Sequence, residues 1–216
     1  MSLSERINAL LPQTQCTRCG FPDCAAYAQG IAIGEASINR CPPGGAEGVQ
    51  RLAVLTGQTP LPLDTSRGFE GPRSVAVIDE AWGIGCTLCL PVCPTDAILG
   101  SNKRMHSVIE KHCTGCELCL PVCPVDCISL VNVTQTQTGW NAWSADQADA
   151  ARIRYARHRT RETKAQTANT DRLVEKAQAK LADLPAHSRL TDPDLLDQKR
   201  TVIEAALARA RAKRDQ

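Results

Sequence analysis

A thirty-residue internal repeat constrains the fold of this chain more than any other feature. Residues 83–98 read GIGCTLCLPVCPTDAI and residues 113–128 read CTGCELCLPVCPVDCI, which gives eleven identities in sixteen positions. Three cysteines of each half align, but the first cysteine of the second half, Cys113, is aligned with Gly83. A short segment so rich in cysteine has little material for an apolar core, so we expect it to fold around bound metal.

The cysteine content points to metal binding for a second reason. The chain has 216 residues and 12 cysteines, and its longest apolar runs fall far short of the roughly 18–20 residues of a membrane span. It also lacks the positive n-region and apolar h-region of a secretory signal. We therefore expect a cytoplasmic protein, and structural disulfides are rare in that compartment.

The spacing Cys113-x2-Cys116-x2-Cys119-x3-Cys123-Pro124 is that of bacterial ferredoxins. Three closely spaced cysteines wrap a loop around one iron–sulfur cube, while the fourth ligates the other cluster as the chain turns away at proline. Zinc also binds Cys-x2-Cys pairs, but three such close cysteines suit it poorly. The predicted ligands are Cys113, Cys116, Cys119 and Cys93 for cluster II, and Cys86, Cys89 and Cys123 for cluster I.

Cluster I is one ligand short, because Gly83 supplies no donor atom. Four outcomes are open: a [3Fe–4S] centre, a [4Fe–4S] centre with water or another ligand on the exposed iron, a site that does not assemble, or a replacement ligand. The replacement would be Cys127, which lies four residues after Cys123. The simpler interpretation of Cys127 is an inert thiol beside the cluster.

A second cysteine set lies near the N-terminus, in the pattern Cys16-x2-Cys19-x4-Cys24-x16-Cys41-Pro42. Four cysteines, one distant and followed by proline, suit a single iron–sulfur cube. This spacing is less specific than that of the repeat, and zinc is the alternative occupant.

The sequence predicts an α+β chain in four parts. These are an N-terminal 4Fe-4S module (1–56), a linker rich in Gly and Pro (57–73), a two-cluster ferredoxin domain (74–135) and a basic helical extension (144–216). Residues 1–143 hold nine Lys and Arg against twelve Asp and Glu, whereas residues 144–216 hold sixteen against eleven and no cysteine. We expect helices over 3–11, most of 24–41, 46–56, 144–182 and 193–213, strands at 74–79 and 105–110, and a helical turn at each Pro-x-Asp-x-Ile.

The remaining polar residues give weaker signals. The four histidines (His106, His112, His158 and His187) are isolated in the sequence, and we interpret them as surface or packing residues. Arg154, Arg157 and Arg161 share a helical face that is expected to be solvated; an acidic redox partner, an anionic membrane and nucleic acid are the alternative interpretations. No motif for bond-making chemistry on an organic substrate is present.

The order of the cysteine module, the linker and the two-cluster domain resembles the B subunit of Rnf/Rsx electron-transport complexes, especially the soluble proteobacterial ferredoxins that carry this name. The matching segments are IDE at 78–80, GSNKRMH at 100–106 and CPVDCI at 123–128, and the resemblance covers about residues 5–135. It implies a [4Fe–4S] cluster on Cys16, Cys19, Cys24 and Cys41. The family has a cysteine where this chain has Gly83, and a hydrophobic N-terminal anchor that this chain lacks.

These observations predict an iron–sulfur electron carrier, a ferredoxin that passes single electrons between redox partner proteins and is not itself an enzyme. It would hold two complete [4Fe–4S] sites and a third site as [3Fe–4S] or incompletely ligated [4Fe–4S]. One alternative is a peripheral B subunit of a membrane ion-translocating Rnf/Rsx redox complex, on the inner face of the plasma membrane. The other is a nucleic-acid-associated iron–sulfur protein that uses the arginine-rich helix.

Overall fold

A computed structural model describes residues 1–214 of the chain. It forms two compact units, the first spanning Met1–His158 and the second beginning at Arg159. One long helix, α4 (Ala145–Ala182), starts in the first unit and continues into the second. All twelve cysteines therefore lie in the first unit, together with the first turns of α4.

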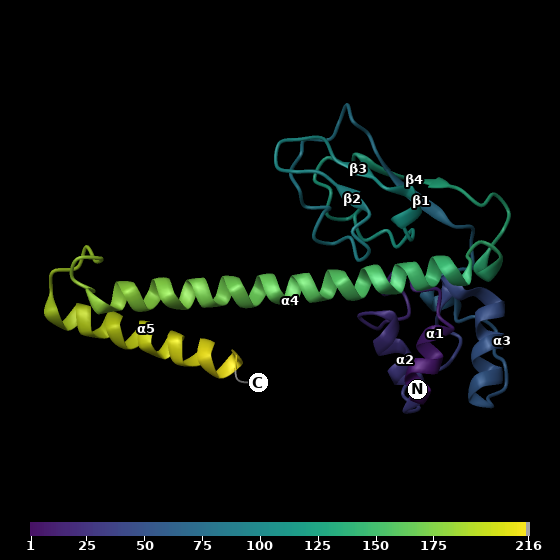
Figure 1. The fold of residues 1–216 in the computed structure, drawn as a ribbon, viewed down its shortest axis with the longest axis horizontal. Coiled ribbons are helices and arrows are strands. Elements are labelled where there is room, and N and C mark those ends of the chain that lie inside the picture. Colours follow the sequence, from purple (N-terminus) through teal and green to yellow (C-terminus); the bar gives the residue numbers. More distant parts are fainter. Residues whose placement is uncertain (215–216) are drawn as a thin grey trace. The chain divides into compact units, whose positions relative to one another are not determined.

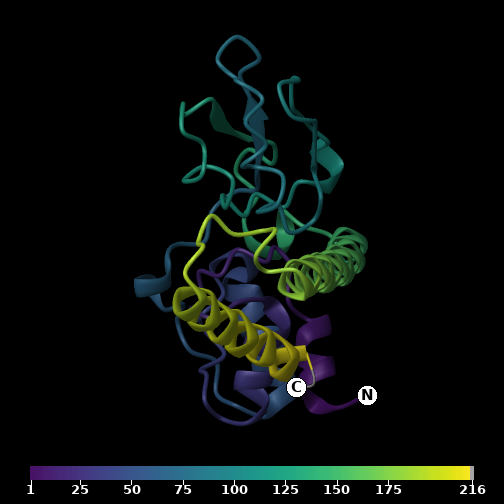
Figure 2. The ribbon, with the colours of Figure 1, turned by 90° about the vertical axis from the view of Figure 1, so that its left-hand side faces the viewer.

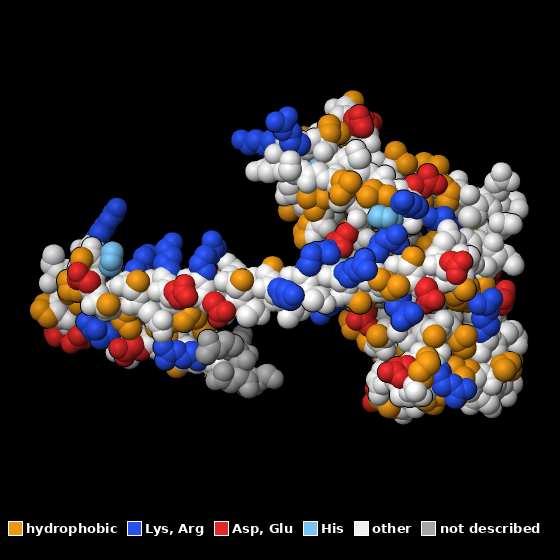
Figure 3. Space-filling model, in the orientation of Figure 1, with side chains coloured by type: hydrophobic (Ala, Val, Ile, Leu, Met, Phe, Trp, Pro, Cys, Tyr) orange, Lys and Arg blue, Asp and Glu red, His pale blue; other side chains and the backbone are white. Residues whose placement is uncertain are grey.

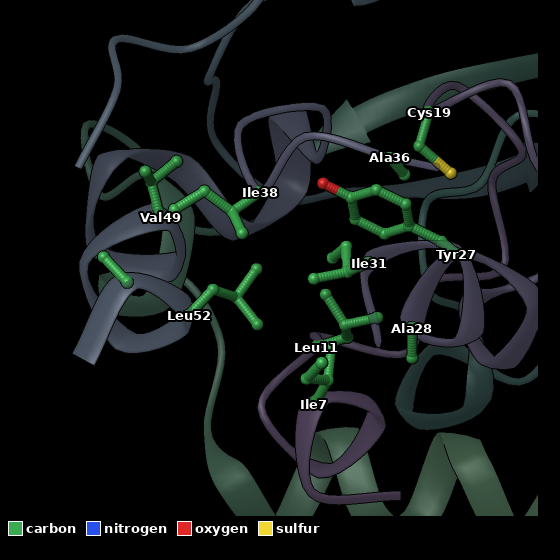
Figure 4. Close-up of a cluster of buried hydrophobic side chains, with 11 residues drawn as sticks. Ile7, Leu11, Cys19, Tyr27, Ala28, Ile31, Ala36, Ile38, Val49 and Leu52 are labelled. Atoms are coloured by element: carbon green, nitrogen blue, oxygen red, sulfur yellow. The ribbon is translucent and has the colours of Figure 1, made fainter. Parts of the chain in front are cut away.

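The N-terminal part of the first unit is a small helical module (Figure 1). It contains α1 (Leu3–Ala9), α2 (Cys24–Ala32) and α3 (Gly45–Thr56), with a short 3-10 helix, η1 (Pro42–Gly44), before α3. Figure 4 shows the aliphatic and aromatic side chains of these helices meeting in one core. The largest fully buried members of this core are Ile7, Leu11, Tyr27, Ile38 and Leu52.

The predicted helices of this module are confirmed, except that the second is much shorter than expected. Helix α2 ends at Ala32, whereas the sequence pattern extended it toward Cys41. Gly34 adopts a positive φ of 80°, and the N–H groups of Glu35 and Ala36 both donate to the carbonyl of Gly30. This C-terminal turn ends the helix and frees residues 33–41 to carry Cys41 back toward the other cysteines.

Residues 74–132 form two small antiparallel sheets. Strand β1 (Ser74–Ile78) pairs with β4 (Ile128–Asn132), and β2 (Ile98–Leu99) pairs with β3 (Ser107–Val108). The first strand of one repeat thus pairs with the last strand of the other, which brings the two cysteine loops together. The buried core consists of Val75, Ala76, Ala97, Ile98 and Ile128 together with Cys89, Cys93, Cys113 and Cys119.

Two local predictions for this domain are corrected. The Pro-x-Asp-x-Ile segments are tight turns and not helical turns, because Asp96 and Asp126 adopt positive φ values of 49° and 48°. The strand expected over 105–110 is confined to Ser107–Val108 and is followed by a 3-10 turn, η3 (Glu110–His112). The turn ends at Cys113, the first ligand position of the second half.

The first turns of α4 pack on two tryptophans that precede the helix. Trp140, Trp143, Ala148 and Ala151 form a separate buried cluster. A capping box starts the helix: the N–H of Gln147 donates to Ser144 Oγ, and the Ser144 N–H donates to the Gln147 side chain.

These turns of α4 also bridge the two cysteine-containing parts. Tyr155 donates a hydrogen bond to Asp23 of the N-terminal module, and His158 Nδ1 lies 2.8 Å from Asp96 of the two-cluster domain. Both views of the ribbon show this end of α4 between α1–α3 and the strands (Figures 1 and 2). The helical extension therefore helps to hold the first unit together.

The segment 57–73 is attached to its surroundings by specific contacts. Asn39 donates to the carbonyl of Pro62, and the Asp64 N–H donates to the carbonyl of Asn39. Glu70 accepts hydrogen bonds from the Ala46 N–H and from Thr138 Oγ1. The Gly- and Pro-rich segment thus fixes the N-terminal module against the end of the two-cluster domain.

The second unit contains the rest of α4 and helix α5 (Pro193–Arg214). Both helices match their predicted ranges closely, and α5 begins after Asp192, whose side chain accepts the Asp194 N–H. Leu184 and Leu207 are buried in this unit. Lys and Arg side chains line the visible surface of α4 (Figure 3). None of the helices formed by residues 1–214 is both long and apolar enough to span a bilayer.

Candidate metal centres

The N-terminal cysteines come together from three segments. Cys16 and Cys19 lie on the loop before α2, Cys24 is the first residue of α2, and Cys41 precedes η1. The pKa of Cys24 is raised to about 12, mainly by burial and in part by the neighbouring Cys16 and Cys19. The pKa of Cys41 is also raised, first by burial and then by Cys24, Cys16 and Cys19. Four thiols that repel one another when ionised are the donor set expected around a cation or a cationic cluster.

Two buried glutamines, which the sequence reasoning missed, shape the loop that carries this set. Gln13 and Gln15 are 2% and 3% exposed and both have positive φ. Gln15 accepts the Cys24 N–H at 2.9 Å and donates to Gln13, which in turn donates to Asn8. This chain of hydrogen bonds ties the cysteine loop to α1 and α2. The only signal in the sequence is the pair of glutamines just before Cys16, PQTQC.

The cysteines of the repeat surround two cavities, which we call cavity I and cavity II. Cavity II is lined by all four predicted cluster II ligands, together with apolar residues of the strands. These ligands come from both halves of the repeat: Cys93, Cys113, Cys116 and Cys119. Cavity I is lined by Gly83 and by the three predicted cluster I ligands, Cys86, Cys89 and Cys123. The fourth cysteine of each half therefore faces the cavity of the other half.

The two cavities are nearly equal in size, although one has lost a cysteine. With the space that is open to solvent counted, cavity I measures about 360 Å³ and cavity II about 350 Å³. Among residues 1–214, no three His, Cys, Asp or Glu side chains close on a single ion position. The cysteines instead stand around open space, as a multi-atom cluster requires.

Backbone amides point at the cysteine sulfurs in matching places. The Ala97 N–H donates to Cys93 Sγ at 3.1 Å, and thirty residues later the Cys127 N–H donates to Cys123 Sγ at 3.3 Å. The Ala76 N–H donates to Cys113 Sγ at 3.4 Å. Such donors stabilise thiolates and the negative charge of an iron–sulfur cluster.

The thiol pKa values fit this picture of crowded donors. Burial raises the pKa of Cys116 to about 12, and Cys93 and Cys113 add to the shift. Burial likewise raises the pKa of Cys119 to about 12, with Cys116 and Cys113 as the next causes. Binding to iron would relieve the repulsion, because a metal ion stabilises the deprotonated form of its ligands.

The backbone at Gly83 keeps the geometry of a ligand position. The Gly83 N–H donates to the carbonyl of Asp79 at 2.9 Å, and thirty residues later the Cys113 N–H donates to the carbonyl of Ile109 at 3.1 Å. Gly85 and Gly115 have φ of 66° and 67°. Gly83 thus lacks the sulfur but not the turn that would present it.

Two further polar side chains line cavity I. Cys127 Sγ lies 3.4 Å from Cys123 Sγ and lines cavity I. This position agrees with both interpretations of Cys127, as an inert thiol beside cluster I and as a replacement ligand. His106 is 6% exposed, and its Nδ1 lies 3.5 Å from Cys89 Sγ. The sequence predicts a surface or packing role for His106, because its contact partner Cys89 lies seventeen positions away and no local motif links the two.

The N-terminal cysteine loop faces the cluster II loop. Thr114 Oγ1 donates to the carbonyl of Thr14 at 2.9 Å, and Arg18 forms an ion pair with Glu117 at 2.5 Å. Cys16 and Cys116 both act on the pKa of Arg18, so this cation lies near a sulfur of each set. The order of the three cysteine sets in space is therefore N-terminal set, cavity II, cavity I.

The donor sets fit the groups for which they were predicted. Cavity II has four cysteines and the N-terminal set has four, as one [4Fe–4S] cube requires. Cavity I has room for the same group but three of the expected thiolates. Fold and donor chemistry together define an iron–sulfur protein, with an N-terminal iron–sulfur domain, a two-cluster domain and long C-terminal helices.

Comparisons with known proteins agree with this class. Residues 76–130 match a family described as "4Fe-4S dicluster domain", and residues 11–43 match one described as "Putative Fe-S cluster". A comparison with solved structures found no match.

Several curated relatives are named as the B subunit of an ion-translocating oxidoreductase complex. That of Thiobacillus denitrificans is 60% identical over 107 residues, which are 50% of this chain and 57% of the relative. Those of Azoarcus sp. and Alkalilimnicola ehrlichii are 57% and 56% identical, each over 64% of this chain and 75% of the relative. The chain belongs to this family, the B subunits of ion-translocating oxidoreductase complexes, as the resemblance predicted.

Proposed function

We propose that this chain is an electron-transfer subunit of an ion-translocating oxidoreductase complex, and that its three cysteine sets hold the clusters through which single electrons pass. The sequence alone favoured a free ferredoxin, but the names of the relatives give more support to a complex subunit. Partner subunits would then supply the electron donor and acceptor. The clusters would supply one-electron redox chemistry, and the protein would hold them in order.

The ligands in this proposal are the three sets described above. The N-terminal cluster would be held by Cys16, Cys19, Cys24 and Cys41; cluster II by Cys93, Cys113, Cys116 and Cys119; and cluster I by Cys86, Cys89 and Cys123. Crossed ligation of clusters I and II is supported by the residues that line the two cavities. It also places the two clusters in one rigid domain, which fixes their separation.

One observation carries the function: the contact between the N-terminal cysteine loop and the cluster II loop. Thr14–Thr114 and Arg18–Glu117 join a loop of one cluster directly to a loop of the next. The other links between the two parts, through α4 and through the segment 57–73, do not join one cysteine loop to the other. With the contact between the two loops, the three sites form a series with cluster II in the middle, and electrons that enter at one end have a defined route to the other.

The experiment has two parts. The anaerobically purified chain is assayed for iron and sulfide, and its clusters are titrated by EPR; three sites that accept electrons are expected. The tagged chain is then isolated from membranes of its own organism, where salt-resistant co-purification with membrane redox subunits is expected. Recovery of the loaded chain without such subunits, under conditions that keep the complex intact, would refute membership of the complex in favour of a free carrier.

A further inference from the structure

His106 occupies a position that a surface residue does not adopt. It ends the exposed loop 101–105, yet only 6% of its own surface is accessible. Its ring lies directly over Gly100, where a Cβ atom would come within 1.8 Å of the ring carbon Cδ2. Any side chain at position 100 would displace the ring, so Gly100 is part of what directs His106 into cavity I.

The surroundings of His106 offer it few polar partners. The other lining residues of cavity I are the cysteines, two glycines and the aliphatic Ile78, Ile84, Val125 and Ile128. Nδ1 lies 3.5 Å from Cys89 Sγ, and Nε2 is buried with no hydrogen-bond partner among the described residues. Burying a polar ring with only one hydrogen-bond partner costs free energy. The contact with Cys89 is therefore the interaction most able to offset that cost.

Binding of Cys89 to iron would determine which of the two groups donates the hydrogen bond. A metal-bound cysteine has lost its proton, so its sulfur only accepts hydrogen bonds. The proton between the two groups must then be carried by His106 Nδ1. The imidazole is held as the Nδ1–H tautomer, and its N–H donates to a negatively charged sulfur, which is the stronger type of hydrogen bond.

Cavity II has other groups at its ligand sulfurs: the Thr114 hydroxyl lies within hydrogen-bonding reach of Cys116, and the Ala76 N–H donates to Cys113 Sγ at 3.4 Å. The residue aligned with His106 in the other half of the repeat is Ala76, which lines cavity II, and no histidine is among the residues that line that cavity. Cavity I therefore differs from its twin in two ways: it lacks the thiolate of residue 83, and the sulfur of Cys89 faces a buried imidazole. Both differences reduce the negative charge that the protein places around the cluster.

We propose that His106 is a positioning residue for cluster I, donating its Nδ1–H to the Cys89 thiolate and so favouring the reduced, more negative state of that cluster. The inference rests on the proposed ligation of cluster I by Cys86, Cys89 and Cys123. A more negative Cys89 sulfur would strengthen this hydrogen bond, since its N–H faces the larger charge. The donor acts on cluster I alone.

The first test measures reduction potentials of clusters I and II by EPR-monitored titration of the full chain. His106→Leu removes the donor but keeps an apolar side chain of similar bulk. His106→Asn is the matched rescue, because its amide nitrogen branches from the same carbon as Nδ1. His187→Leu, on a histidine outside the cysteine-containing unit, is the control.

In His106→Leu we expect the equilibrium constant for reducing cluster I to fall about tenfold, a shift of about 59 mV for one electron. His106→Asn should recover part of this shift, and cluster II should not change. An unchanged cluster I potential in His106→Leu, or equal shifts in both clusters, would overturn the inference.

The second test needs no variant, so it does not depend on the fold surviving a substitution. The wild-type chain is labelled with ¹⁵N-histidine, and pulsed EPR is recorded on the cluster I signal. A weak nitrogen coupling is expected for a hydrogen bond to a ligand sulfur. The strong coupling of a nitrogen bound to iron, or no coupling, would overturn the inference. A chain with cluster II intact and no cluster I signal would instead refute the ligand assignment on which it rests.

Discussion

The loops of residues 83–93 and 113–123 follow the same path but present different groups to their cavities. Both begin with an N–H bonded to the carbonyl four residues earlier, and both use a glycine at positive φ two residues after the first ligand position. Cys113 lines cavity II, whereas Gly83 brings no side chain to cavity I, where His106 lies beside another sulfur. Backbone geometry and donor chemistry are therefore separable in this repeat.

This difference teaches that a cluster site is specified at two levels. The turns, glycines and amide donors form the cavity, and they are unchanged where the thiolate is missing. The number of thiolates determines which type of cluster the cavity can bind and the reduction potential of that cluster. Because cavity I keeps its volume, we expect it to hold a cluster of altered ligation, and a cluster with one thiolate less should have a higher potential than cluster II.

The largest effect on stability should come from removing clusters I and II, because both cavities depend on the same small domain. The domain of residues 74–135 has two short sheets, and its core includes four of its own predicted ligands. Ligation must supply much of its folding free energy. Anaerobic chelation should abolish its cooperative thermal transition, followed by near-UV circular dichroism, while the helical far-UV signal of α4 and α5 largely persists. An unchanged transition temperature in stripped protein would contradict this.

The second test changes the one ligand position at which the two loops differ, residue 83 in the first loop and residue 113 in the second. Gly83→Cys should convert cluster I to an ordinary [4Fe–4S] centre. If the wild-type centre is [3Fe–4S], its EPR signal should disappear and the iron content should rise by about one per chain. A Cβ at position 83 would lie 3.3 Å from the Asp79 carbonyl oxygen, a tight contact that requires a shift of a few tenths of an ångström. Cys113 occupies the equivalent turn in the second half, with its N–H bonded to the carbonyl of Ile109.

The matched reverse variant of this exchange is Cys113→Gly. It should leave cluster II with one thiolate less, so that this cluster has labile iron and a higher reduction potential. If Gly83→Cys left iron content and spectra as in the wild type, the missing thiolate would not be the cause of any difference between the clusters.

A smaller effect is expected from Arg18, which is near cluster II and the N-terminal set but not part of the cluster I site. Arg18→Gln removes a positive charge close to Cys16 and Cys116. The potentials of these two clusters should fall, by less than the roughly 59 mV of a tenfold change, since the pair with Glu117 is partly exposed.

Cluster I should keep its potential in Arg18→Gln. Arg51→Gln, which breaks another Arg–Glu pair at the same 2.5 Å, is the control, because its partner Glu47 lies on the same helix. Equal shifts at all three clusters would show that Arg18 acts through the fold instead of through its charge.

The smallest effect is predicted for Cys127→Ser. Two sulfurs on one tetrahedral metal, with bonds of about 2.3 Å, lie roughly 3.8 Å apart. At 3.4 Å from Cys123 Sγ, Cys127 would share the iron of Cys123 and leave the position opposite Gly83 open. Iron content and EPR spectra should barely change, whereas Cys123→Ser should destroy cluster I. Loss of cluster I in Cys127→Ser would identify Cys127 as a ligand.

Local patterns in the sequence were sufficient for the ends of most helices. The capping box at Ser144 and the Asp192-Pro193 start are contacts between residues a few positions apart, so α4 and α5 were predicted almost to the residue. The length of α2 and the Pro-x-Asp-x-Ile turns were predicted wrongly. In both cases positive φ values at Gly34, Asp96 and Asp126 break a pattern that periodicity alone reads as helical.

The sequence by itself determined which cysteines share a loop, and it predicted the ligand sets and the missing cysteine at position 83. Cysteine spacing encodes loop geometry directly, because ligands three residues apart must share a tight loop. Tertiary structure decided what no spacing encodes: that His106 reaches Cys89 across seventeen residues, that Gln13 and Gln15 support the first loop, and that Arg18 and Thr14 meet the cluster II loop. These contacts depend on how separate segments pack, and packing is set by the whole core instead of by neighbours in the chain.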